Sequence, residues 1–222
     1  MNIGVLGTGM VGNAIGSKLI QLGHKVKMGS RTPTNEKAAT WAKNSGPNAS
    51  HGTFADAASF GEVLFNCTAG MGSLEALKMA GEKNLNGKVL VDVSNPLDFS
   101  KGMPPSLSVS NTDSLAEQIQ RAFPKVKVVK SLNTMNCYVM VNPSLVPGDH
   151  NVFVNGNDAG GKATVKDLLK SFGWKENNIL DLGDITAARG TEQILPVWVR
   201  LMGTFQHPMF NFNIVLGTPP KK

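Results

Sequence analysis

The sequence predicts an α/β fold, a doubly wound and mainly parallel sheet covered by helices. Short β-rich runs alternate with longer helical patterns up to about residue 185, the alternation that a helix-covered parallel sheet requires. A glycine-rich turn joins the first run to the first helical pattern. Together these features indicate a Rossmann-type domain over residues 1–185, which includes two added strands, and a short C-terminal helical segment over residues 186–222.

Composition excludes several other classes of protein. The chain has 222 residues, of which 41% are hydrophobic and only 17% are charged, against about 25% charged in typical soluble proteins. A disordered, highly charged tail is therefore excluded. Cys67 and Cys137 are the only cysteines and belong to no CxxC or zinc-like spacing, so we expect small buried side chains, with no disulfide framework and no metal site.

Charge and hydropathy bear on partners and location. The longest apolar run, Ile194 to Phe205, is interrupted by Arg200 and is shorter than the roughly 20 residues of a membrane span. With no leader segment visible, we expect a cytoplasmic protein without a membrane partner. The net charge of +6 comes from scattered basic residues, which argues against nucleic acid and favours a small phosphate-bearing ligand.

Two strand and helix pairs open the chain. The run Asn2 to Gly7 is the first expected strand, and the amphipathic pattern Met10 to Leu22 is the first helix, ended by a glycine. Lys25 to Met28 is the second strand. We expect Thr32 to cap the next helix, with Pro33 at its first helical position.

The alternation continues through the rest of the chain. Ser50 to Gly52 is a weak third strand, Thr53 and Asp56 have capping-box spacing, and Val63 to Cys67 is an apolar strand. Two prolines and many serines predict a loop over residues 97–111. The other expected elements are strands over 88–93, 127–132, 151–154 and 179–182, and helices over 73–82, 113–123, 158–172 and 186–206, the last broken at Pro196.

The turn after the first strand is a G-x-G-x-x-G motif. It reads Gly7-Thr8-Gly9-Met10-Val11-Gly12 and lies between an apolar strand and an amphipathic helix. In this motif the glycines allow a tight turn, close approach of the backbone to a pyrophosphate, and close packing of helix on strand. The diphosphate then binds free N–H groups at the positive end of the helix. The motif in this position predicts dinucleotide binding.

The end of the second strand indicates which dinucleotide binds. A carboxylate at this position would accept a hydrogen bond from the free ribose 2′-hydroxyl of NAD, but the sequence Met28 to Thr32 contains no acid. Ser30 can donate to a phosphate, Arg31 offers a planar fork, and Lys37 could reach from the next helix. We therefore predict NADP(H), recognised through its 2′-phosphate.

Ligands of open parallel sheets lie beyond the carboxyl ends of the strands. Those ends carry Thr68 and Ala69, Asn95, and Asn133 with Thr134. Small and amide side chains of this kind suit a ribose and a nicotinamide carboxamide.

Side chains for acid–base or nucleophilic catalysis are scarce. None of the four histidines has a carboxylate at useful spacing, and no Ser-His-Asp or Cys-His arrangement is evident. A P-loop-like stretch, Gly156 to Ala163, has alanine where the magnesium-binding hydroxyl belongs, which argues against nucleotide hydrolysis. We therefore predict no catalytic side chain. Hydride transfer to a flavin-like ring depends on proximity and orientation more than on such a group.

With these motifs in place, the chain resembles the NADPH-dependent deazaflavin reductases, the coenzyme F420-dependent NADP oxidoreductase family. It is also similar to the oxidoreductase domain of STEAP-type metalloreductases. The resemblance extends over nearly the whole chain, including residues 156–173 and 188–202. It implies a deazaflavin ring lying against the nicotinamide and covered by the last helices.

The resemblance also implies roles for particular residues. Thr8, Gly9, Met10 and Val11 would hold the diphosphate, while Ser30, Arg31 and Lys37 would hold the 2′-phosphate. Thr68, Ala69 and Asn95 would flank the ribose and the nicotinamide. The second pocket, for the acceptor, would be lined by Asn133, Thr134, Cys137, Pro196, Leu201 and Met202.

Three interpretations of function remain open. The first is an NADPH-dependent oxidoreductase that exchanges hydride with a deazaflavin, and a flavin acceptor fits the sequence equally well. The second is a reductase of imines or β-hydroxy acids resembling pyrroline-carboxylate reductases, although those have a longer helical domain, commonly with a catalytic lysine. The third is a non-catalytic module that senses NADP(H) and passes the signal to a protein partner.

The end of the chain suggests an oligomer. Residues 208–216 include Met209, Phe210, Phe212, Ile214 and Val215, an apolar stretch that is long for an exposed end. We expect this stretch to pack on a second subunit, which makes the protein a homodimer through its C-terminal segment.

Overall fold

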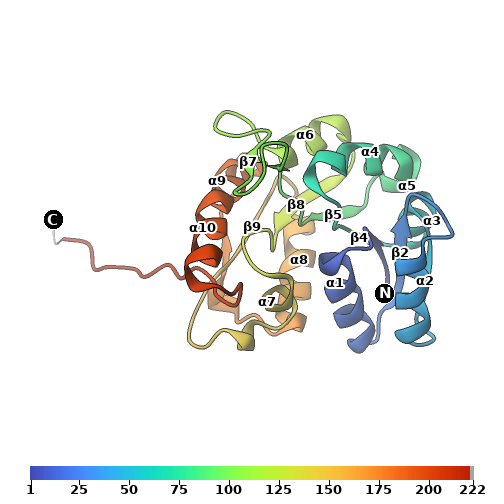
Figure 1. The fold of residues 1–222 in the computed structure, drawn as a ribbon, viewed down its shortest axis with the longest axis horizontal. Coiled ribbons are helices and arrows are strands. Elements are labelled where there is room, and N and C mark those ends of the chain that lie inside the picture. The colour runs from blue at the N-terminus through green and yellow to red at the C-terminus, as the bar shows by residue number, and fades with distance from the viewer. Residues whose placement is uncertain (221–222) are drawn as a thin grey trace.

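The computed structural model describes residues 1–220, which form an eight-stranded sheet with helices on both faces (Figure 1). Neighbouring strands are parallel except β8 and β9, which are antiparallel. The doubly wound, mainly parallel α/β fold is therefore confirmed. Across the sheet the strands are β10 (Ile179–Asp181), β9 (Val152–Gly156), β8 (Lys127–Ser131), β5 (Val89–Asp92), β4 (Val63–Asn66), β1 (Asn2–Leu6), β2 (Lys25–Ser30) and β3 (Ala49–Thr53).

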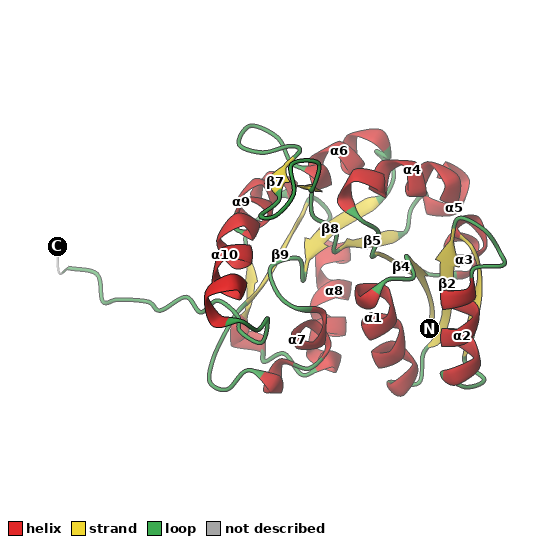
Figure 2. Cartoon of the chain, in the orientation of Figure 1, coloured by secondary structure: helices red, strands yellow, loops and turns green. Residues whose placement is uncertain are grey.

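Helices cover the sheet in two layers (Figure 2). Their apolar residues form two separate clusters, one on each face of the sheet. One face carries α1 (Met10–Gln21), α2 (Glu36–Asn44), α7 (Cys137–Val141) and α8 (Ala159–Phe172). The other carries α3 (Phe54–Phe60), α4 (Gly70–Ala80), α5 (Glu82–Leu85), α6 (Leu115–Ala122) and the start of α9 (Ala188–Gln193), which α10 (Leu195–Phe205) follows.

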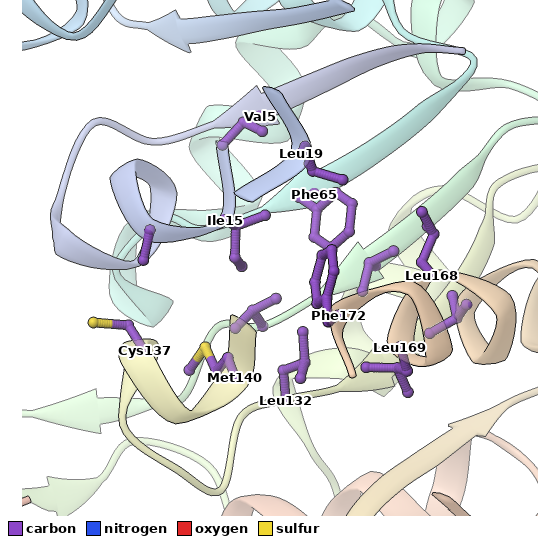
Figure 3. Close-up of a cluster of buried hydrophobic side chains, with 14 of the residues drawn as sticks. Val5, Ile15, Leu19, Phe65, Leu132, Cys137, Met140, Leu168, Leu169 and Phe172 are labelled. Carbon is purple, nitrogen blue, oxygen red and sulfur yellow. The ribbon is translucent and has the colours of Figure 1, made fainter. Parts of the chain in front are cut away.

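The larger cluster holds α1 in place (Figure 3). Ile15 and Leu19 of α1 face Phe65 of β4 and Phe172 of α8, and all four side chains are almost fully buried. Burying each such side chain contributes roughly 1.5–3 kcal/mol. The start of α1, which carries the glycine motif, is thus tied to the centre of the sheet.

The second helix begins later than the sequence predicts. The expectation of a Thr32 cap and Pro33 at the first helical position is wrong, because β2 continues to Ser30 and a turn occupies the next residues. The N-cap is Asn35, whose Oδ1 accepts a hydrogen bond from the Ala38 amide at 3.0 Å. Asparagine is a strongly preferred N-cap residue, and Asn35 lies three residues after the expected cap, Thr32.

The predicted loop over residues 97–111 contains a small hairpin. Strands β6 (Leu97–Asp98) and β7 (Ser106–Leu107) pair antiparallel. Two-residue strands produce no periodicity, so the pattern gave no sign of them. Similarly, the helix expected over 73–82 begins at Gly70 and ends before Gly81, whose φ of +85° separates α4 from α5.

Several local predictions agree with the structure. Thr53 and Asp56 form the expected capping box at α3, and Gly173 ends α8 in a left-handed conformation. Pro196 lies in the first turn of α10, just after the break from α9. Over residues 1–220, no helix has both the length and the apolar character needed to cross a membrane.

Candidate active site

The strand order reverses between β1 and β4. From β1 the chain builds outward through β2 and β3, whereas β4, β5 and β8 extend the sheet in the other direction. Such a switch point leaves a crevice beyond the carboxyl ends of the strands, where open α/β sheets bind their ligands. The glycine motif follows β1, and Thr68 and Ala69 follow β4, so both border this crevice.

The glycine motif leaves the N-terminus of α1 bare. Gly7 has φ +122°, and a Cβ at Gly12 would collide with the carbonyl oxygen of Gly7. Gly9 is the N-cap, no side chain caps the helix, and the first turn holds no acidic residue. A Cβ at Gly9 would meet open space, and Met10 beside it is exposed. Free amides and the positive helix end fit a diphosphate.

Two cations stand beside this crevice. Arg31 follows β2, and its Nη2 lies 3.9 Å from the point where a Gly72 side chain would begin, so the guanidinium extends toward the start of α4. Lys37 lies exposed in the first turn of α2. Within residues 1–220 neither forms an ion pair. Ser30 is buried, and its hydroxyl donates to the Thr32 carbonyl at 2.6 Å.

A groove of about 790 Å³ extends from the glycine motif between α1 and α2. It brings together Thr8, Gly9, Met10 and Lys37, four of the predicted cofactor residues, and Val11 follows them on α1. Its other polar residues were not predicted, although their spacing of four on each helix marks one face. These are Asn13 and Ser17 on α1 and Thr40 and Asn44 on α2, and the lining also includes Glu36, Ser45 and, from α7, Tyr138.

The residues after β4 belong to a buried hydrogen-bond network. The Thr68 hydroxyl donates to Asn66 Oδ1 at 2.7 Å and lies 2.8 Å from the Ser73 hydroxyl. Asn66 Nδ2 in turn donates to Asp92 Oδ1 at 2.9 Å. Ala69 is the exposed N-cap of α4, which no side chain caps. These buried hydrogen bonds therefore fix the orientation of the Thr68 side chain.

Asn95 and Asn133 bind each other at the carboxyl ends of β5 and β8. Asn95 Nδ2 donates to the Asn133 carbonyl at 2.8 Å, and Asn133 Nδ2 donates to Asn95 Oδ1 at 2.9 Å. Asn133 Nδ2 also donates to the Thr191 carbonyl, just before Glu192 in the C-terminal segment. Leu132 has φ +64°, a strained conformation for leucine, which turns the chain into Asn133. One residue predicted for the cofactor and one for the acceptor thus form a pair.

The remaining predicted acceptor residues lie apart from the groove. Thr134 and Cys137 are buried, whereas Pro196, Leu201 and Met202 of α10 are half-buried, and none of them lines the 790 Å³ groove. Burial raises the pKa of the Cys137 thiol. Burial, together with the charge of Asp92, also raises the pKa of Cys67. Neither thiol is a reactive thiolate at neutral pH.

A buried ion cluster behind the site was not predicted. The Lys130 ammonium lies 2.8 Å from Asp92 and 2.8 Å from Glu192, and the side chains of Lys130 and Asp92 are fully buried. It also donates to the Ser94 carbonyl. Burial alone lowers the pKa of Lys130, but the two carboxylates prevail and hold the pKa above its ordinary value. The available signal was a lysine directly after Val128 and Val129 in the expected strand 127–132.

Comparisons with known proteins agree with this fold. Residues 2–96 match the family described as NADP oxidoreductase, coenzyme F420-dependent. A protein of Arthrobacter sp. FB24, provisionally described as an F420-dependent NADP reductase, is 51% identical, with a TM-score of 0.93 over 97% of this chain and 100% of that one.

Two further relatives are more distant. The metalloreductase STEAP3 of Rattus norvegicus is 28% identical over 88% of this chain, which spans 37% of that longer protein. An imine reductase of Myxococcus stipitatus, solved with NADP⁺, shares the fold at 18% identity and a TM-score of 0.66, over 93% of this chain and 64% of that one.

The fold and the crevice define a dinucleotide-binding oxidoreductase of the Rossmann type. The chain belongs to the family of coenzyme F420-dependent NADP oxidoreductases, and it is an NADP-dependent oxidoreductase.

The buried cluster predicts a large effect of Lys130→Met on stability. Removing the ammonium leaves two carboxylates buried without a cation, and breaking such a pair costs about 3–5 kcal/mol. Urea unfolding should show this decrease in the free energy of unfolding. The matched control is Lys175→Met, which removes the exposed pair with Asp149 and should leave the free energy of unfolding nearly unchanged, because exposed ion pairs contribute little. Equal losses in the two variants would contradict the importance of the buried cluster.

Proposed function

We propose that this oxidoreductase transfers a hydride between NADP(H), bound across the β1–β4 crevice, and a deazaflavin such as coenzyme F420, or a flavin. The observation that carries the proposal is the uncapped start of α1 with Arg31 and Lys37 beside it, neither of which forms an ion pair within residues 1–220. The first feature suits a diphosphate and the second a 2′-phosphate. Family membership supports the choice of a ring-shaped hydride acceptor.

Each part of the cofactor would have its own residues. Amides of Thr8, Gly9, Met10 and Val11 would bind the diphosphate, with Arg31 and Lys37 on the 2′-phosphate. The Ser30 hydroxyl already donates to the Thr32 carbonyl, so Ser30 would hold the turn beside the phosphate. Thr68, Ala69 and Asn95 would flank the ribose and nicotinamide. NADPH supplies the hydride from its nicotinamide ring, and a proton from water completes the reduction of the acceptor. The task of the protein is then to orient two rings and to exclude water.

The acceptor would lie at the carboxyl edge near the C-terminal segment. Asn133, Thr134 and Cys137 would line its pocket from the end of β8 and the start of α7. Pro196, Leu201 and Met202 would cover it from α10, so that residues 186–222 serve as the cover of the acceptor site. Because Asn133 Nδ2 already donates two hydrogen bonds, it would act through its position and not as a free donor. The neutral Cys137 thiol would add apolar contact.

A reductase of imines or β-hydroxy acids is the second candidate, favoured by the shared fold of the imine reductase. Such an enzyme would need a proton donor near the substrate. Residues 186–220 contain no lysine, and Lys130 is fully buried between carboxylates. These observations favour the ring acceptor, whose reduction needs no such side chain.

Hydride transfer can be observed directly. In stopped-flow mixing under anaerobic conditions, we expect NADPH absorbance and the acceptor chromophore to bleach together with a deazaflavin. Separate mixing with FMN, FAD and riboflavin tests the flavin acceptor. NADPH binding without bleaching of any of these would refute the proposal, and turnover of a cyclic imine would favour the second candidate. Binding without any turnover, with a captured protein partner, would favour an NADP(H)-sensing module.

Arg31 should determine the preference for NADPH over NADH. A charge-assisted hydrogen bond contributes about 1.5–3 kcal/mol, so Arg31→Ala should weaken NADPH binding by roughly tenfold to hundredfold. NADH binding should stay unchanged, because NADH lacks the 2′-phosphate. Calorimetric titration of both cofactors measures this, with Lys43→Ala in the last turn of α2 as a control for the loss of one positive charge. An equal loss for both cofactors would contradict the assignment.

The C-terminal stretch supports a homodimer. Its first part packs on its own chain, since Met209 joins the core and the Phe212 carbonyl accepts from the Asn151 amide at 2.8 Å. The Ile214 amide also donates to Asn151 Oδ1 at 2.7 Å, while its side chain is half exposed. Beyond Ile214 the chain leaves the body (Figure 1), and Val215 and Leu216 are 83% and 87% exposed. We expected all of residues 208–216 to contact a partner, but the first part of this stretch contacts its own chain. Only the last residues of the stretch remain available for a partner. We propose that Ile214, Val215 and Leu216 pack on a second copy.

Light scattering after size exclusion tests the dimer. The wild-type mass should be twice that of one chain, and Val215→Asp combined with Leu216→Asp should give the monomer mass, because buried charges oppose association. Thr218→Asp is the control for added charge in the same segment. A monomeric wild-type protein would refute the dimer.

A further inference from the structure

The buried cluster and the paired asparagines form one closed ring. Lys130 Nζ donates to the Ser94 carbonyl, and the next residue is Asn95. The Asn95 side chain exchanges two hydrogen bonds with Asn133, which also donates to the Thr191 carbonyl. The residue after Thr191 is Glu192, whose carboxylate returns to Lys130 at 2.8 Å.

Glu192 is the residue that closes this ring. Its Oε1 also accepts from the Ala116 amide at 3.1 Å, and its Oε2 accepts from the Leu115 amide at 2.8 Å. It therefore joins α9, β8 and the start of α6, and its negative charge lies at the positive end of that helix. Every one of these contacts uses Glu192 as an acceptor.

We propose that Glu192 and Lys130 are positioning residues for the nicotinamide half of the cofactor, acting through the Asn95–Asn133 pair. The ring joins the ends of β5 and β8 to the C-terminal segment at the edge where that half would lie. Asn95 is the member of the ring that would contact the cofactor. Full burial of the ions makes the ring rigid, because any displacement would strand a charge in the interior. This inference rests on the proposed binding of NADP(H) in the crevice.

Glu192→Gln separates positioning from folding. The buried cluster holds two carboxylates and one ammonium, so the variant leaves Lys130 neutralised by Asp92. The glutamine amide nitrogen accepts no hydrogen bond, so at the Oε2 position it opposes the Leu115 amide, and at the Oε1 position it opposes both Lys130 and the Ala116 amide. In either orientation the ring loses the ion pair between residue 192 and Lys130, without a stranded charge.

The readout compares two probes. Adenosine 2′,5′-bisphosphate contains only the adenosine half, whereas NADPH contains both halves. In Glu192→Gln, affinity for the bisphosphate should stay within about twofold, while NADPH affinity should decrease about tenfold, as expected for lost orienting hydrogen bonds. Both affinities come from calorimetric titration of the full chain, with thermal unfolding to confirm the fold.

Arg189→Gln is the matched control. Arg189 also anchors α9, through Nε to Glu117 Oε2 at 2.9 Å, but it lies outside the ring. This variant should bind both probes as the wild type does. If Arg189→Gln lost as much NADPH affinity as Glu192→Gln, any contact that anchors α9 would have the same effect. That result would overturn the inference. Unchanged NADPH affinity in Glu192→Gln would overturn it as well.

If Glu192→Gln does not fold, Glu192→Asp keeps the charge, shortens its reach and serves in the same comparison. The titrations require no acceptor, so a wild-type protein that reduces neither deazaflavin nor flavin would refute the proposed acceptor while the probe comparison still decides this inference. A wild-type protein that binds the bisphosphate as tightly as NADPH would overturn it, because no nicotinamide contact would then exist.

Discussion

The contact between Gly12 and the carbonyl of Gly7 is the constraint from which the site follows. No side chain fits between them, so α1 begins directly over the end of β1. Burial of Ile15 and Leu19 against Phe65 and Phe172 then holds the helix at that height. Because Gly9 offers no capping side chain, the first amides of α1 stay free for a ligand. The dinucleotide site is thus a consequence of packing.

The other side of the crevice is organised by buried charge. Lys130 would be costly in the interior alone, and Asp92 and Glu192 offset that cost only in this arrangement. Glu192 comes from a segment more than 60 residues further along the chain than Lys130. The ion pair between Glu192 and Lys130 therefore helps to hold the C-terminal segment against the sheet. Such an ion pair is more directional than apolar packing.

Sequence reasoning succeeded where short-range rules act. The fold class, the Thr53 capping box and the glycine ending α8 all follow from spacing and backbone conformation. It failed at Thr32, where Asn35 offered a competing cap, and at the hairpin β6–β7, which is too short for any period. Lys130 was missed because its partners lie 38 and 62 positions away in the sequence. Such contacts are set by strand order and have no local pattern.

The two sides of the crevice differ in how their polar groups are satisfied. Beside the glycine motif, Arg31 and Lys37 have no ion-pair partner among residues 1–220 and remain available to a phosphate. Toward β5 and β8, Asn95, Asn133 and Thr68 already bond to other protein groups. Charged side chains without an ion-pair partner contribute affinity, because a ligand phosphate can pair with them. Side chains that already have hydrogen-bond partners hold a fixed geometry. The proposed hydride transfer needs affinity at the adenosine end of the cofactor and fixed geometry at the nicotinamide end, and in the proposed site this division of polar groups would supply each of them.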